Sequence, residues 1–198
     1  ILKTEKQHKN FSNLIGNIFH FLANKKNTSF KIYGDQSPIT THFCKELINE
    51  FTDSKFILLI RDPRDVVLSY SKINNHPAKN LHHAIWKWND SIAMLDFLKK
   101  RKPTNAMYLK YEDLVSNPQQ TIESICSFLK VNYSDELLDH SKSAENLGVS
   151  KLAIHSNLKN KITTSSIGKW KSELSKEQIK KINSLTRTNR ARFGYTDN

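Results

Sequence analysis

An arginine and a serine flank the point where a strand should give way to a helix, in the segment FILLIRDPRDVVLSYS at residues 56–71. Arg61 directly follows five apolar residues, and Ser69 lies seven residues after Asp62, two turns along the same helix face. A guanidinium is a planar fork that matches two phosphate oxygens, and a serine can add a hydroxyl donor. This spacing is typical of a phosphate-binding site.

A purely structural role fits the same residues. In that interpretation Ser69 is a small packing residue, and Arg61 makes an ordinary surface ion pair with one of three carboxylates, Asp62, Asp65 or Glu112. Spacing alone does not choose between the two interpretations.

Asp35 is a candidate general base. It lies in YGDQSPIT (33–40), just past the short apolar stretch FKIY (30–33), and a carboxylate at a strand end could take the proton of an attacking hydroxyl. Gly-Asp followed by Ser-Pro is also ordinary turn chemistry, in which an aspartate caps its own backbone. Residue types alone favour the turn.

A third polar segment, SSIGKW at 165–170, could bind an anion through its backbone. Its hydroxyls, glycine and lysine stand almost in a row: Ser165, Ser166, Gly168 and Lys169. Trp170 could be a stacking platform or a core anchor for the last helix, and the core anchor is the favoured interpretation.

Strands and helices that would position these residues alternate along the chain. The apolar run at 55–60 is typical of a parallel strand covered on both faces, with further strands expected at 30–33 and 106–114. Asp62 as N-cap and Pro63 as first helical residue predict a helix there. Other helices are expected at 10–22, at 81–100 with Ile85, Trp88, Ile92, Leu95 and Leu98 inward, at 118–129, near the C-terminus, and after Thr40 or Thr41 with Phe43, Leu47 and Phe51 inward. The order predicts an α/β fold.

Composition limits the possible classes. We expect a single domain over residues 1–198, and the formal charge of +12 predicts attraction to phosphate, sulfate, nucleic acid or an acidic surface. Cys44 and Cys126 lack metal-ligand spacing and are expected to be buried thiols, so no metal site is predicted. No signal peptide or membrane span is evident, which predicts a cytoplasmic protein, or one of the Golgi lumen if a eukaryotic anchor was removed.

Three segments together resemble the sulfotransferases that use 3′-phosphoadenosine 5′-phosphosulfate (PAPS). RDPRDVVLSYS resembles their 3′-phosphate motif, with its arginine and serine at Arg61 and Ser69. YEDLVSNP resembles the segment whose tyrosine lies near the adenine, here Tyr111, and the segment from SSIGKW to FGY is similar to the closing segment of the bacterial and Golgi-type branches. The resemblance implies a P-loop-NTPase-like three-layer sandwich with a mainly parallel sheet flanked by helices.

The resemblance also implies a reaction. A sulfuryl group would pass from PAPS, without a metal, to a hydroxyl or amine of a saccharide, peptide, lipid or small alcohol. Asp35 would be the base, because GDQSP aligns with the Glu-Lys-Ser/Thr-Pro segment of several branches, and Ser165, Ser166, Gly168 and Lys169 would help to enclose the nucleotide. Gln36 replaces the usual lysine, and Thr163-Thr164-Ser165 stand where cytosolic members carry Arg-Lys-Gly.

One family feature is not found in this sequence. Sulfotransferases open with a strand and a Gly-rich, P-loop-like turn that binds the 5′-phosphosulfate. Two other classes therefore stay open: a non-catalytic nucleotide-binding or scaffold relative, and a basic nucleic-acid-binding domain, which the net charge favours. A kinase-like phosphoryl transferase is less favoured, because the sequence shows neither a Walker lysine nor a magnesium-binding acidic pair.

Overall fold

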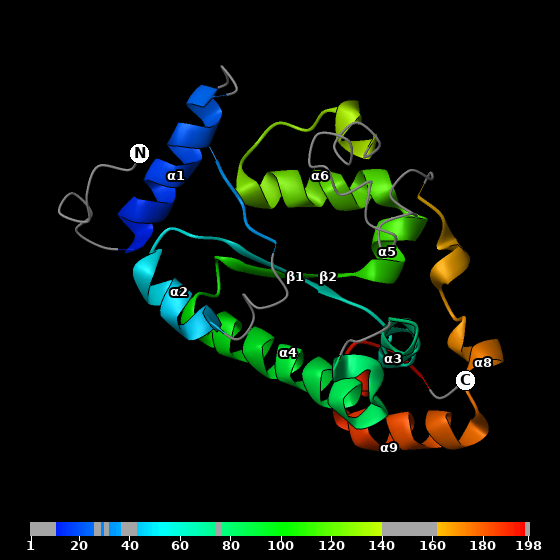
Figure 1. Cartoon of the computed structure of the whole chain (residues 1–198). Coiled ribbons are helices and arrows are strands. Elements are labelled where there is room, and N and C mark those ends of the chain that lie inside the picture. The colour runs from blue at the N-terminus through cyan, green and yellow to red at the C-terminus, as the bar shows by residue number, and fades with distance from the viewer. Residues whose placement is uncertain are drawn as a thin grey trace. The chain divides into compact units, whose positions relative to one another are not determined.

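Figure 1 shows the chain as a computed structural model, which describes residues 11–25, 29, 32–36, 43–73, 77–139 and 162–196. Contacts along the chain define two compact units, Ile1–Ser54 and Lys55–Asn198. The expectation of one domain over the whole chain stays a prediction.

Two helices belong to the unit Ile1–Ser54. The first, α1 (Phe11–Lys25), confirms the helix predicted at 10–22. Backbone N–H of Ser12, at its start, donates to Glu50 Oε1 at 2.7 Å, and the Phe11 ring meets Phe51 edge-on with centroids 6.1 Å apart. These contacts join α1 to the end of α2 (Cys44–Glu50).

The predicted inward face of α2 is wrong. Cys44 and Ile48 are its buried residues, whereas Phe43 is 52% exposed. The reason is that Phe43 and Phe51 are the cap residues on either side of the helix, so helical periodicity does not govern where their side chains lie. The cap candidates Thr40 and Thr41 lie outside the described residues.

The strand predicted at 30–33 is not formed where the structure describes it. Residues 32–36 have no regular secondary structure, and residues 30 and 31 lie outside the described part. Tyr33 instead stacks on Phe19 of α1, with ring centroids 4.4 Å apart. An aromatic contact to a helix has replaced the expected strand pairing.

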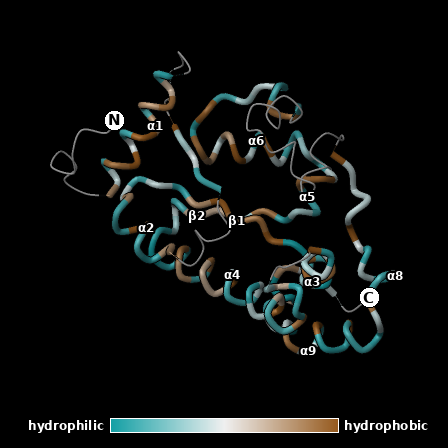
Figure 2. The backbone as a smooth tube through the Cα atoms, in the orientation of Figure 1, coloured by the Kyte–Doolittle hydropathy of each residue, from teal (hydrophilic) through white to brown (hydrophobic). Residues whose placement is uncertain are grey.

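The described part of the sheet lies in Lys55–Asn198. Strands β1 (Phe56–Ile60) and β2 (Ala106–Lys110) pair in parallel, which confirms the predicted parallel strand. Its predicted coverage on both faces is wrong, because Ile57 and Leu59 are 38% and 54% exposed. In Figure 1 they run between α4 on one side and α5 and α6 on the other. Figure 2 shows β1 hydrophobic along its length, as expected for a strand between helices.

Strand β2 is shorter than predicted. It ends at Lys110, and α5 (Tyr111–Ser116) follows at once. Two acidic residues, Glu112 and Asp113, stand in the first turn of α5, where negative charge favours a helix N-terminus. Tyr111 is therefore the first residue of a helix rather than part of a strand.

The helix after β1 forms as predicted. In α3 (Pro63–Ser71), Asp62 is the N-cap and accepts the backbone N–H of Arg64 at 2.9 Å. After the short 3-10 turn η3 (Pro77–Lys79), α4 (Leu81–Arg101) contains all five of its predicted inward residues in buried positions: Ile85, Trp88, Ile92, Leu95 and Leu98. Three of them, Trp88, Ile92 and Leu95, join Ile60 and Phe193 in one hydrophobic cluster.

The regular elements described in the rest of the chain are helices. Helix α6 (Pro118–Leu129) confirms the prediction and is followed by η4 (Asp135–Leu138). Residues 140–161 lie outside the described part, and the elements after them are η7 (Thr164–Ser166), α8 (Trp170–Glu173) and α9 (Lys176–Arg192). None of the described helices combines the length and the apolar character that crossing a bilayer requires.

Candidate functional site

Arg61 lies where three segments of Lys55–Asn198 meet. It directly follows β1, and its carbonyl accepts a hydrogen bond from Trp88 Nε1 at 2.9 Å. Its guanidinium carbon lies 4.4 Å from the centroid of the Tyr111 ring, and its Nη2 donates to the Ser166 carbonyl. The structure thus brings together Arg61, Tyr111 and Ser166, which the sequence placed in three separate motifs.

Little in the described residues neutralises the charge of Arg61. Its nearest carboxylate is Asp65, with 4.0 Å between Nη2 and Oδ2, at the limit of an ion pair. A guanidinium has several N–H donors, and the bond to Ser166 engages only Nη2. Arg61 Nε is buried with no acceptor among the described residues. The cation therefore keeps donor capacity.

The other two expected ion-pair partners of Arg61 are engaged elsewhere. Asp62 binds Arg64 through two bonds, from Nε to Oδ1 at 2.9 Å and from Nη2 to Oδ2 at 2.7 Å. Glu112 accepts the backbone N–H of Asp62 at 3.0 Å and the Tyr195 hydroxyl at 2.7 Å. An ordinary surface ion pair of Arg61 with Asp62 or Glu112 is therefore not formed.

Arg64 connects the start of α3 to Trp170. Its side chain is 2% exposed, and its guanidinium carbon lies 3.7 Å from the centroid of the Trp170 ring. Trp170 is itself buried, which confirms the core-anchor interpretation. The close cation–π contact brings the beginning of α8 against the first turn of α3.

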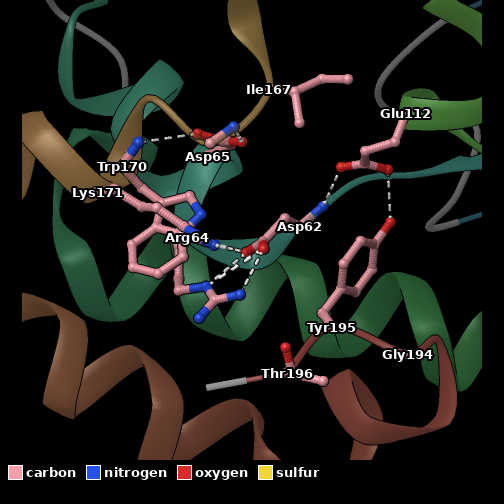
Figure 3. Close-up of a pocket in the computed structure, with 11 residues that line it drawn as sticks. Asp62, Arg64, Asp65, Glu112, Ile167, Trp170, Lys171, Gly194, Tyr195 and Thr196 are labelled. Atoms are coloured by element: carbon pink, nitrogen blue, oxygen red, sulfur yellow. Dashed lines mark hydrogen bonds and ion pairs between the residues drawn. The ribbon is translucent and has the colours of Figure 1, made fainter. Parts of the chain in front are cut away.

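Asp65, at the third position of α3, holds the segment that precedes Trp170. Its Oδ2 accepts the backbone N–H of Gly168 at 2.7 Å and its Oδ1 accepts that of Trp170 at 3.1 Å, as Figure 3 shows for the carboxylate and Trp170. Gly168 has φ +72°, a conformation that favours glycine. Sequence reasoning considered Asp65 only as a partner of Arg61. A carboxylate in the first turn of a helix that begins beside a core strand was the available signal.

A cavity of about 440 Å³ opens beside these residues. Figure 3 shows Tyr195 reaching Glu112 across it. Burial, together with the Glu112 carboxylate, raises the pKa of Tyr195 above its usual range. Glu112 and Tyr195 were not predicted as site residues. The cavity is lined by Asp62, Arg64, Asp65, Glu112, Ile167, Gly168, Trp170, Lys171, Gly194, Tyr195 and Thr196.

The remaining predicted residues lie at exposed positions or in the other unit. Ser69 on α3, Ser165 and Lys169 are exposed, and the Ser165 hydroxyl forms a hydrogen bond of 2.8 Å with that of Thr163. Asp35 is an exposed residue of Ile1–Ser54, and its role stays a prediction. The described residues contain no group of three or more histidine, cysteine, aspartate or glutamate side chains able to hold a metal.

The fold places a charged residue, Arg61, at the carboxyl end of the parallel strand β1. This is the place where α/β proteins bind ligands. Residues 4–194 match the sulfotransferase domain family, so the chain belongs to that family. The sulfotransferase domain from the curacin biosynthetic pathway shares the fold, with a TM-score of 0.63 and 24% identity over 87% of this chain and 68% of that chain. This likeness confirms the predicted fold class.

Two relatives of known sequence match this chain over a smaller share of their own length. A Caenorhabditis briggsae relative is 27% identical over 158 residues, which is 76% of this chain and 56% of that protein. Protein-tyrosine sulfotransferase of Drosophila melanogaster is 27% identical over 117 residues, 54% of this chain and 23% of that protein. The chain thus spans less than two thirds of the length of these relatives.

Proposed function

We propose that this chain binds PAPS and transfers its sulfuryl group to an acceptor hydroxyl or amine. The observation that carries the proposal is the meeting of Arg61, Tyr111 and Ser166 at the carboxyl end of β1. Family membership supports the class of reaction. The role of each residue is our inference.

Arg61 is the proposed ligand of the 3′-phosphate. Its charge is only weakly paired within the described residues, and a phosphate would supply the acceptors that its guanidinium lacks. Ser69 would add its exposed hydroxyl. The backbone N–H of Arg64, at the start of α3, is not available to the phosphate because Asp62 already accepts it.

Tyr111 and the segment 163–169 would enclose the nucleotide. The N–H of Gly168 already donates to Asp65, so contacts from this segment to an anion would come from its side chains and its other N–H groups. Ser165, Ser166 and Lys169 are the residues available, the last with a positive charge. Hydroxyls in place of the usual Arg-Lys-Gly would leave Arg61 as the main cation.

The acceptor would attack the sulfur of PAPS in line with the bond that breaks. The acceptor oxygen or nitrogen forms the new bond to sulfur as the bond from sulfur to the bridging oxygen of PAPS breaks, which leaves adenosine 3′,5′-bisphosphate. Asp35 would take the acceptor proton, and positioning with electrostatics would supply most of the catalysis. Among the acceptor classes, relatives named for protein tyrosine favour a phenolic hydroxyl on a protein.

Calorimetry tests the cofactor site directly. We expect adenosine 3′,5′-bisphosphate to bind far more tightly than 5′-AMP, which lacks the 3′-phosphate. Arg61→Ala should weaken binding of the bisphosphate by about 2–5 kcal/mol and hardly change binding of 5′-AMP. Arg187→Ala, at an exposed position of α9, is the matched control.

Other outcomes of the same experiment identify the alternatives. Equal binding of both nucleotides would reject the PAPS site, and tight, salt-dependent binding of generic DNA would then favour the nucleic-acid-binding class. Preference for the bisphosphate without sulfuryl transfer to any acceptor would indicate a non-catalytic relative.

We propose a cytoplasmic location because the two cysteines are free thiols. Both Cys44 and Cys126 are buried free thiols. Free thiols without a disulfide suit a reducing compartment. Cell fractionation with an antibody to this chain is the test, and recovery from a Golgi fraction would reject the proposal.

A further inference from the structure

Resting on the proposed function, we propose that Asp65 is a positioning residue that fixes the segment 166–170 so that the Ser166 carbonyl and the Arg61 guanidinium face each other at the nucleotide site. Asp65 would not touch the nucleotide. It would act through the backbone that it holds.

The contacts of Asp65 account for its burial. Its side chain is 1% exposed, and an ionised carboxylate is costly to bury unless donors surround it. Two backbone N–H groups, of Gly168 and Trp170, supply one donor to each oxygen. The intervening Lys169 has helical angles and Gly168 is left-handed, so the N–H groups of this turn converge on one anion, and that anion is Asp65.

The position of the turn determines the position of Ser166. Ser166 lies two residues before Gly168, and its carbonyl accepts from Arg61 Nη2. Asp65 is four residues after Arg61, at the same end of α3. Residues 61–65 therefore carry both the Arg61 cation and the Asp65 carboxylate. Because the carboxylate holds the segment that faces the cation, we expect its loss to release that segment from Arg61.

An exposed contact between the same elements provides a matched control. Lys72, the residue that follows α3, binds Glu173 of α8 at 2.5 Å, with side chains 53% and 37% exposed. Asp65 and Glu173 each connect α3 with α8 or with the residues just before α8. Of the two, only Asp65 is buried and accepts hydrogen bonds from backbone N–H groups. If any connection between these elements were sufficient, Glu173→Gln and Asp65→Asn would act alike.

We expect Asp65→Asn to weaken binding of adenosine 3′,5′-bisphosphate by at least about tenfold, because an amide can accept one N–H but turns its own NH₂ toward the other donor. Glu173→Gln should stay within about twofold of the unmodified chain. Binding of 5′-AMP, measured beside it, should change little in either variant.

Amide hydrogen exchange separates positioning from general destabilisation. In Asp65→Asn the N–H groups of Gly168 and Trp170 should exchange faster, while the N–H of Arg64, which Asp62 accepts, stays protected. If Asp65→Asn does not fold, Gly168→Ala disturbs the same turn without removing the carboxylate. No atom obstructs the added Cβ, so its effect is one of backbone strain, and we expect at least about a threefold loss of affinity.

Each result decides between distinct claims. Faster exchange with unchanged bisphosphate affinity, or unchanged exchange, would overturn the positioning role while the PAPS site stands. Failure of the unmodified chain to prefer the bisphosphate over 5′-AMP would overturn the proposed function and the positioning role together. Selective loss of bisphosphate binding with faster exchange at the two N–H groups would support both.

Discussion

Two Arg–Asp pairs of the described structure are both held by two hydrogen bonds but lie in two different environments. Arg64 binds both oxygens of Asp62 beside the end of β1, and Arg192 binds both oxygens of Asp96 where α9 runs along α4. The side chains of the first pair are 2% and 10% exposed, and those of the second are 44% and 51% exposed. Arg64 uses Nε and Nη2 and Arg192 uses Nη1 and Nη2, but the larger difference between the pairs is burial.

Burial changes what each pair does. An exposed pair is screened by water and contributes little to stability. A buried pair has lost its hydration, so removal of one partner leaves the other charge without compensation. The Arg64–Asp62 pair also touches Trp170 and caps α3, so its loss would reach the segment near Arg61. In the surface pair, Arg192 also lies over an aromatic ring, but its guanidinium carbon is 5.6 Å from the Phe193 centroid, against 3.7 Å for Arg64 and Trp170.

The largest effect is expected from Arg64→Ala. It leaves the Asp62 carboxylate buried and unpaired and removes the contact to Trp170, so the free energy of unfolding should fall by about 3–5 kcal/mol. Urea denaturation measures this. Arg187→Ala on the surface of α9 should change stability little. A loss for Arg64→Ala as small as that of the control would show that burial does not separate the two pairs.

A smaller effect is expected from Arg64→Lys. Lysine keeps the charge but has neither the two-pronged geometry nor the flat surface that stacks on Trp170, and we expect a loss of about 1–3 kcal/mol in the same measurement. Stability equal to that of the unmodified chain would mean that charge alone explains the buried pair.

The smallest effect is expected from Asp96→Asn, about 0.5 kcal/mol after allowance for solvent screening. The hydrogen bond from Arg192 lowers the pKa of Asp96 below its usual 3.8. A lowered pKa means that the pair stabilises the fold above pH 3.8 and that this contribution is lost as the pH falls through the lowered value. Thermal melts should therefore show a constant difference between variant and unmodified chain near neutral pH and none in strong acid. A difference that persists in strong acid would contradict this account.

Apolar periodicity made much of the fold predictable from the sequence. The inward face of α4 was correct at every residue, because a long helix against a sheet must bury one face. Short elements were less predictable. The end of β2 and the face of α2 depended on where a helix begins, and a shift of a few residues moved Tyr111 or Phe43 into another environment.

Only part of the candidate site was predictable from the sequence. Arg61 follows an apolar strand and could be recognised from its neighbours in sequence. For Asp65 the sequence offered only a carboxylate in the first turn of a helix, because the two N–H groups that it accepts lie more than a hundred residues further along the chain and belong to no particular side-chain type. Backbone donors leave no mark in the sequence except glycine at position 168, which was assigned to the nucleotide instead.

The hydrogen bond from Trp88 to the Arg61 carbonyl also gives the molecule an optical readout. Indole emission responds to the polarity and hydrogen bonding of the ring, and Trp88 sits in the hydrophobic cluster with its N–H directed at the residue that we assign to the phosphate. Trp86, by contrast, is 56% exposed. A Trp86→Phe chain would have its remaining indoles at Trp88, bonded to the Arg61 carbonyl, and at Trp170, stacked against Arg64, and its fluorescence would follow motions of the strand end in real time without any added dye.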